Sequence, residues 1–168
     1  MRLFVAALPD PAIVQYLLQV YGGWPRPEID GLRWTGPDQW HVTLRFLGLA
    51  DPIAAAVALD QLGTVAAKAR LGPTTALFGR GILMVPVVGV DSLAGAVAAA
   101  TPGVGETPEN RPFAGHLTLA RSRGRIPAEL VDVPVAGVFP VTEVCLMQSE
   151  TLPEGARYEV LRRWPLRS

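Results

Sequence analysis

The two histidines of the chain each begin the same short pattern, His-x-Thr-Leu, at residues 41–44 and 116–119. In an extended strand, residues i and i+2 point to the same side and lie about 6.5–7 Å apart along the chain. His41 and Thr43 should therefore share one face, as should His116 with Thr118. If the two polar faces converge, they form a cleft lined by two imidazoles and two hydroxyl groups.

Such a cleft suits an in-line displacement at a phosphodiester. One neutral imidazole can remove a proton from the attacking nucleophile, while the other, protonated, gives a proton to the leaving oxygen. The threonine hydroxyls can donate hydrogen bonds to the non-bridging oxygens, where charge accumulates in the transition state. Histidines titrating near 6.5 are suited to both roles close to neutral pH. The residues alone do not tell which histidine is the acid and which is the base.

Two arginines and one aromatic residue accompany these patterns. Arg45 lies two residues beyond Thr43, so alternation predicts that it shares that face and neutralises the anion. By the same alternation Arg121 points to the leucine side of its strand, which makes its contact with a phosphate less direct. Phe113 could stack on a base, although packing of this ring onto the core is the favoured alternative.

The two histidines could instead be structural, bind a metal ion or belong to a binding module without catalysis. Most single histidines are structural, but two histidines in identical local settings favour a shared function. A metal centre is the main rival, yet no HExxH pattern, cysteine cluster or acidic set accompanies them, and threonine is a poor zinc ligand. We therefore predict no metal and no other cofactor. A metal-dependent hydrolase would lose activity to a chelator, and a nucleotide- or RNA-binding module would keep the cleft without significant turnover.

Composition sets broader bounds. A chain of 168 residues fits one domain, residues 1–168, and can bury a sizeable core. Fifteen basic residues balance fifteen acidic ones, which argues against a track along many phosphates but allows a ligand with one or two. The single cysteine, Cys145, suits a reducing cytoplasm. No stretch approaches the ~18 apolar residues of a membrane helix, so we expect a soluble, cytoplasmic protein with no obligate protein partner.

The patterning predicts strands that alternate with two or three helices, typical of an α/β or α+β domain. Asp10 and Asp51 are expected to cap helices, and Pro86 predicts an edge or irregular strand. The motifs lie near the middle of each half, which favours a two-lobed single domain. The expected helices are 11–20, 52–70 and 92–100, and the expected strands are 2–8, 32–35, 41–47, 74–78, 82–90, one beginning at 116, 133–139, 143–149 and 158–163.

At these residues the sequence resembles the two-histidine phosphoesterase superfamily, specifically the RNA 2′,3′-cyclic phosphodiesterases, once called 2′-5′ RNA ligases (LigT-like). The resemblance implies an α+β, bilobal fold, with two antiparallel-sheet lobes and outer helices around a central cleft. Its landmarks span nearly the whole chain in family order: Arg2–Ala6, Arg33-Trp34, His41–Gly48, Arg111–Phe113, His116–Arg121 and Ala156–Leu161.

The resemblance also implies a reaction, the metal-independent hydrolysis of a 2′,3′-cyclic phosphate to a 2′-phosphate. The expected substrates are RNA 3′ ends or small 2′,3′-cyclic nucleotides, and reversible 2′-5′ RNA ligation is a related alternative. In this family pattern His41 is the acid that protonates the departing 3′ oxygen and His116 is the base that activates water. Thr43 and Thr118 hold the phosphate. One departure is visible, since relatives commonly place proline where this chain has Gly115.

Overall fold

The computed structural model describes residues 1–23, 30–64, 66–108 and 110–168. The stretch 21–31, with its glycines and prolines, predicts a loop, but its first residues are helical up to Gly23, and most of the rest lies outside the described residues. The elements, in chain order, are β1 (Arg2–Ala7), α1 (Pro11–Gly23), β2 (Leu32–Trp34), β3 (Val42–Leu49), α2 (Pro52–Leu59), β4 (Ala67–Leu71), β5 (Ala76–Phe78), β6 (Ile82–Val88), α3 (Asp91–Ala100), β7 (His116–Ser122), the short 3-10 helix η1 (Ala128–Leu130), β8 (Gly137–Val141), β9 (Glu143–Leu152) and β10 (Gly155–Pro165).

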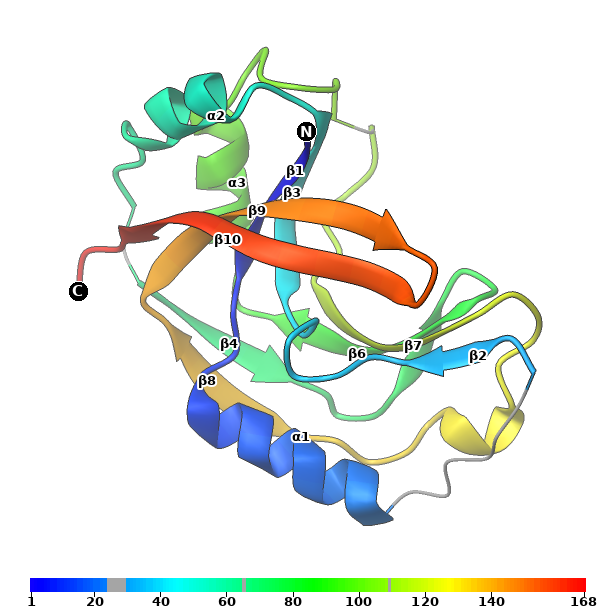
Figure 1. The fold of residues 1–168 in the computed structure, drawn as a ribbon. Helices are drawn as coiled ribbons and strands as arrows, with labels where there is room; N and C mark the ends of the chain where they lie inside the picture. Colours follow the sequence, from blue (N-terminus) through cyan, green and yellow to red (C-terminus); the bar gives the residue numbers. More distant parts are fainter. Residues whose placement is uncertain (24–29, 65, 109) are drawn as a thin grey trace.

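Within the described residues, ten antiparallel strands form one sheet in two parts (Figure 1). The first lobe has the order β10-β9-β1-β3, and the second has the order β7-β6-β4-β8, with β2 added to β7 and β5 added to β6. The lobes meet where β3 pairs with β7, at Val42 and Leu117. These residues directly follow His41 and His116, so the junction itself brings the two motifs together. The bilobal α+β fold expected from the sequence is confirmed.

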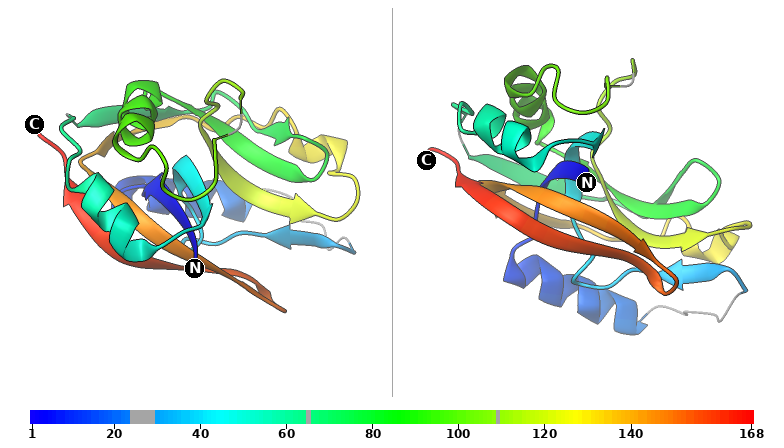
Figure 2. Two further views of the ribbon diagram at one scale, coloured as in Figure 1. Left: turned by 90° about the horizontal axis from the view of Figure 1, so that it is seen from above. Right: turned by 45° about the horizontal axis from the view of Figure 1, so that its top comes forward.

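The helices lie outside the sheet. Helix α3 packs on β3 and contacts α2, whereas α1 packs against β8. Figures 1 and 2 show α1 on one side of the molecule and α2 with α3 on the other. The two predicted caps are present: Asp10 accepts from the backbone N–H of Ile13 at 3.0 Å and Asp51 from that of Ile53 at 3.1 Å.

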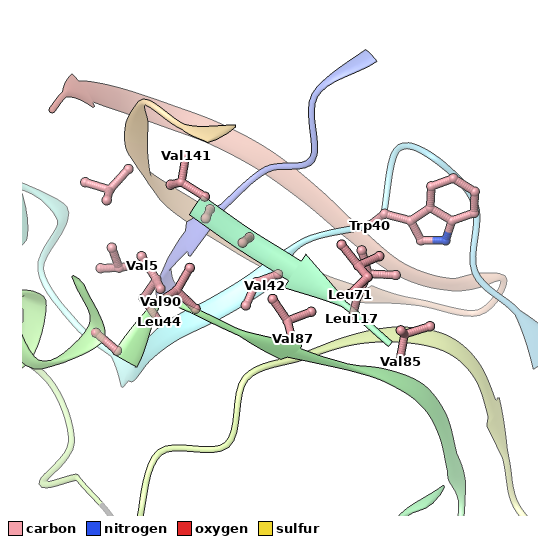
Figure 3. Packing of buried hydrophobic residues seen from close by; sticks show 14 of the residues in the cluster. Val5, Trp40, Val42, Leu44, Leu71, Val85, Val87, Val90, Leu117 and Val141 are labelled. Carbon is pink, nitrogen blue, oxygen red and sulfur yellow. The ribbon is translucent and has the colours of Figure 1, made fainter. Parts of the chain in front are cut away.

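The apolar sides of both lobes meet in one core (Figure 3). Val42 and Leu117, the residue pair at the junction, are completely buried, and the neighbouring Trp40 is almost so. Because the residues between each histidine and threonine are held in this core, the polar side chains on either side of them are fixed on the opposite face.

One sequence prediction about the elements is wrong, and another is confirmed in part, because β6 is irregular, with a register shift against β7 between Leu83 and Met84, but does not lie at an edge. The alanine-rich helix expected at 52–70 ends at Leu59, and Ala67–Leu71 is strand β4, paired along its length with β8. Its buried and exposed residues alternate with a period of two, so sheet pairing overrides the helical propensity of alanine. Strand β6 is interior rather than at an edge. Pro86 is tolerated there because it lies between Met84, where pairing with β5 ends, and Val87, where pairing with β4 begins.

Candidate active site

His41 is fixed by its own strand entry. Its Nδ1 lies 2.8 Å from the carbonyl oxygen of Gln39, and its Nε2 lies 3.0 Å from the hydroxyl oxygen of Thr43. Because a carbonyl oxygen only accepts, Nδ1 must carry the hydrogen. In the neutral ring Nε2 is then the acceptor, and the Thr43 hydroxyl donates to it. The shared face predicted for His41 and Thr43 is confirmed.

His116 repeats this arrangement in the second lobe. Its Nδ1 lies 2.9 Å from the carbonyl oxygen of Ala114, again two residues back along the chain. This bond selects the same tautomer, with Nε2 left to exchange a proton. In both histidines, therefore, Nδ1–H is held by the carbonyl oxygen two residues back and Nε2 is the other ring nitrogen.

The rings around the two histidines differ. The His41 ring packs against Phe4 of β1, with centroids 4.8 Å apart, and meets the ring of Tyr158 of β10 edge-on at 5.0 Å. His116 instead stacks on Phe78 of β5, at 4.3 Å and an interplanar angle of 18°. His41 is thus enclosed between two aromatic rings from its lobe, whereas His116 rests on one.

This enclosure changes the acidity of His41. Burial is the main cause that lowers its pKa from 6.5 to about 4; the carbonyl of Gln39 opposes the shift, and the positive charges of Arg121 and His116 add smaller contributions to it. In the unliganded protein at neutral pH His41 is therefore a neutral ring with a lone pair on Nε2. The Val42–Leu117 pairing brings the two histidine motifs side by side, and the positive charges of Arg121 and His116 both act on the His41 ring.

Arg121 reaches this site through an irregularity in β7. Thr118 pairs with Met84 of β6 and Ala120 pairs with the adjacent Leu83, so Leu119 is an extra residue in a β-bulge. The bulge reverses the alternation and turns Arg121 to the same face as His116 and Thr118. The prediction that Arg121 points to the leucine side is therefore wrong.

Arg45 shows the opposite outcome. Thr43 pairs with Ala6 and Arg45 pairs with the adjacent Val5, so a bulge at Leu44 turns Arg45 away from the histidine face. Arg45 is 7% exposed, and its guanidinium donates to the carbonyl and hydroxyl oxygens of Thr101 and to two further carbonyl oxygens, those of Val104 at 3.2 Å and Glu106 at 3.3 Å. The expectation that it shares a face with Thr43 is wrong, and Arg45 instead fastens the loop after α3 to β3.

Known proteins resemble the chain over nearly all of its length. The RNA 2′,3′-cyclic phosphodiesterase of Thermus thermophilus is 32% identical to this chain, and the alignment covers 99% of this chain and 91% of that protein. The chain belongs to the RNA 2′,3′-cyclic phosphodiesterase family. A protein of the same name from Geobacillus stearothermophilus is 26% identical over 97% of this chain, but the chain spans only 57% of its length. No protein-family model matches the chain.

Solved structures share the fold of this phosphodiesterase family member. TT0787 of Thermus thermophilus has a TM-score of 0.79 at 28% identity, and LigT of E. coli in complex with 3′-AMP has a TM-score of 0.79 at 22% identity. Each comparison covers 99% of this chain and 98% of the other. The expected family and fold are thereby confirmed.

The one visible departure from the family pattern has a structural reason. A Cβ atom added at Gly115 would lie 2.4 Å from the carbonyl oxygen of Val87 in β6, which is too close for any side chain. The backbone N–H of Val87 donates to the carbonyl of Gly115 at 2.9 Å. Glycine therefore lets β6 approach the entry of β7 just before His116.

The aromatic rings that contact the histidines were not identified from the sequence. The ring of Phe113 packs against the main core, which was the favoured alternative to base stacking and is confirmed. Phe4, Phe78 and Tyr158 contact the histidines, and each comes from a different strand. Phe4 and Tyr158 lie in the opening and closing family landmarks, whereas nothing local marked Phe78.

Within the described residues, no group of three or more His, Cys, Asp or Glu side chains could hold a metal ion. None of the helices described is long and apolar enough to span a membrane.

Proposed function

We propose that this protein hydrolyses the 2′,3′-cyclic phosphate at RNA 3′ ends, or in small cyclic nucleotides, to a 2′-phosphate without a metal ion. The observation that carries the proposal is the matched pair of histidines, each with Nδ1–H held by a backbone carbonyl. Nε2 of His41 also meets the Thr43 hydroxyl, and Thr118 takes the corresponding position two residues after His116. Membership of the RNA 2′,3′-cyclic phosphodiesterase family supports the same reaction.

In the proposed step, Nε2 of His116 takes a proton from water as its oxygen attacks phosphorus. The bond between phosphorus and the 3′ oxygen breaks, and Nε2–H of His41 gives its proton to that oxygen. Thr43 and Thr118 donate hydrogen bonds to the non-bridging oxygens, and Arg121 offsets their negative charge. One water is consumed, and each histidine ends in the protonation state with which the other began.

Because the pKa of His41 is about 4 in the unliganded protein, His41 must take up a proton from solution when the substrate binds before it can act as the acid. A phosphate anion about 4 Å away stabilises the charged ring by about 4 kcal/mol at an effective dielectric constant of about 20. This is equivalent to roughly three pKa units, enough to bring His41 from about 4 to near neutrality. Binding of the anionic substrate thus favours the protonated form of His41 that the proposed step requires.

Phosphorus NMR of a dinucleotide with a 2′,3′-cyclic phosphate, incubated with the protein in excess EDTA, tests the reaction. Clean conversion to the 2′-phosphate is expected. A cyclic phosphate that stays intact but broadens on adding protein would instead indicate a binding module without turnover. Loss of activity on EDTA treatment would indicate a metal-dependent hydrolase, and formation of 2′-5′ linked products from added 5′-hydroxyl RNA would indicate the reverse, ligating reaction.

The direction of proton transfer has its own test. A His116→Gln variant should bind the cyclic dinucleotide without turning it over, and calorimetry in two buffers of different ionisation heat then counts protons. Uptake of close to one proton per site at pH 6 is expected if His41 becomes the acid. Binding without proton uptake would make His41 the base.

We further propose that residues 1–168 act as a single bilobal domain, because both histidines are held by one continuous sheet. The buried free thiol of Cys145 on β9 suits a reducing compartment, which favours the cytoplasm.

A further inference from the structure

A cavity of about 480 Å³ opens beside His41. Its wall includes Gln39, whose carbonyl accepts from His41, and Tyr158, whose ring meets the His41 ring edge-on. Arg121, which acts electrostatically on His41, lines it as well. The cavity therefore adjoins the candidate active site through residues that contact or act on His41, and its volume lies within the range of small-ligand pockets, about 300–1,000 Å³.

The lining of this cavity is strongly basic. Arg33, Arg121 and Arg123 contribute to it, and none of its lining residues among those described is acidic. Arg33 and Arg121 are direct partners across the β2–β7 pairing, an arrangement in which like charges destabilise a sheet. In a chain with zero net charge, this concentration of arginines indicates a site for an anion.

The arginines are held at the cavity by the backbone around them. The N–H of Arg123 donates to the carbonyl of Gly31 at 3.3 Å, and the guanidinium of Arg33 donates to the carbonyl of Pro153 in the β9–β10 turn at 3.4 Å. The side-chain amide of Gln39 donates to the carbonyl of Ala156 at 2.8 Å. These bonds join the β2 segment to the first lobe, so the cavity has walls from both lobes.

We infer that this cavity is a subsite for the nucleotide on the 5′ side of the reacting end, with Arg123 and Arg33 on its phosphodiester, so that RNA chains are preferred over mononucleotides. The inference rests on the proposed function. An RNA strand whose cyclic phosphate lies at the two histidines carries its next phosphate one nucleotide away, and the basic cavity beside His41 offers guanidinium groups for it. Guanidinium groups suit this phosphate, and Tyr158 offers an aromatic surface to the nucleoside.

Three substrates distinguish the parts of this inference. They are cytidine 2′,3′-cyclic phosphate, the dinucleotide ApC with the same cyclic end, and that dinucleotide with a neutral methylphosphonate linkage. We expect kcat/KM to be about tenfold higher for the anionic dinucleotide than for the mononucleotide, because charge-assisted hydrogen bonds are added. The neutral linkage should lose most of this gain.

Arg123→Gln provides the decisive variant. It should lower kcat/KM about tenfold for the anionic dinucleotide and leave the mononucleotide and the neutral dinucleotide unchanged. Arg125→Gln is the matched control, since Arg125 is an exposed arginine outside the cavity lining, and it should leave all three substrates unchanged.

The possible failures separate the subsite from the reaction. Equal turnover of mononucleotide and dinucleotide, or an equal loss on all substrates in Arg123→Gln, would overturn the subsite and leave the proposed function standing. Turnover of none of the three would overturn the proposed function. In that case the subsite is tested separately, by calorimetric measurement of the affinity for the 2′-phosphorylated dinucleotide. The affinity should fall in Arg123→Gln and not in Arg125→Gln. Equal affinity in the two variants would refute the subsite.

Discussion

His41 and His116 each donate Nδ1–H to the carbonyl two residues back, and each precedes one member of the Val42–Leu117 pair that joins the lobes. Yet His41 is enclosed by Phe4 and Tyr158, and its pKa falls to about 4, whereas among the described residues His116 stacks on the ring of Phe78. The same tetrapeptide pattern therefore fixes the same backbone geometry at both histidines, while residues from other strands give the two rings different surroundings. In the proposed reaction, this difference would help one repeated motif to supply two histidines with different roles.

The largest effect should come from removing either ring. His41→Ala and His116→Ala should each lower kcat by about 10²–10⁴-fold, the usual contribution of a positioned acid or base. Because the two act in one step, the double variant should be little slower than the worse single variant. Product formation from the cyclic dinucleotide measures this, and full activity in either single variant would contradict the paired roles.

The next largest effects are expected at Arg45 and Arg121, where one substitution should affect stability and the other kcat/KM. Arg45→Met should lower the free energy of unfolding by about 2–3 kcal/mol, because the buried oxygens of the loop after α3 lose their donor. Arg121→Met should change stability by no more than about 0.5 kcal/mol. It should instead lower kcat/KM by about 10–100-fold, since a charged hydrogen bond to phosphate is lost.

Urea unfolding and steady-state kinetics of both variants separate these outcomes. A stable but inactive Arg45→Met protein, or an unstable but fully active Arg121→Met protein, would reverse the assignment of the two arginines.

The unlike surroundings of the histidines also predict unlike acid sensitivity. The folded-state pKa of His41 is about 4 against 6.5 as its ordinary value, so between these values the unfolded chain binds more protons than the folded one. Stability is therefore lost as the pH falls from 6.5 to about 4, by about 3 kcal/mol at most. His41→Gln should lose that much less stability between pH 7 and pH 4.

His116→Gln is the matched control for this measurement, because its ring sits in the same backbone frame with one aromatic neighbour. If the two variants respond alike to acid, enclosure by Phe4 and Tyr158 does not distinguish the histidines.

The histidine–threonine faces could be predicted from the sequence because they depend on the local period of a strand. The positions of Arg45 and Arg121 could not, because each follows a bulge whose presence depends on the register of a neighbouring strand. Strand β4 was hidden for a related reason. Its alternation of Lys68, Ala69 and Arg70 is short and lies in an alanine-rich stretch, and only pairing with β8 decides it.

The smallest expected effect concerns Phe78, which supports His116 as Phe4 and Tyr158 support His41. Phe78→Leu keeps apolar bulk but removes a stacking contact of about 0.5–1.5 kcal/mol, so kcat should fall by roughly two- to tenfold with little change in KM.

Phe113→Leu, which alters a ring packed on the core rather than on a histidine, is the control and should leave the pH profile of kcat unchanged. An acid and a base acting together give a bell-shaped profile, and in Phe78→Leu one limb of it should shift while the other stays, because only one of the two histidines loses a ring contact. A shift of both limbs together would mean that the aromatic neighbours do not tune the two histidines separately.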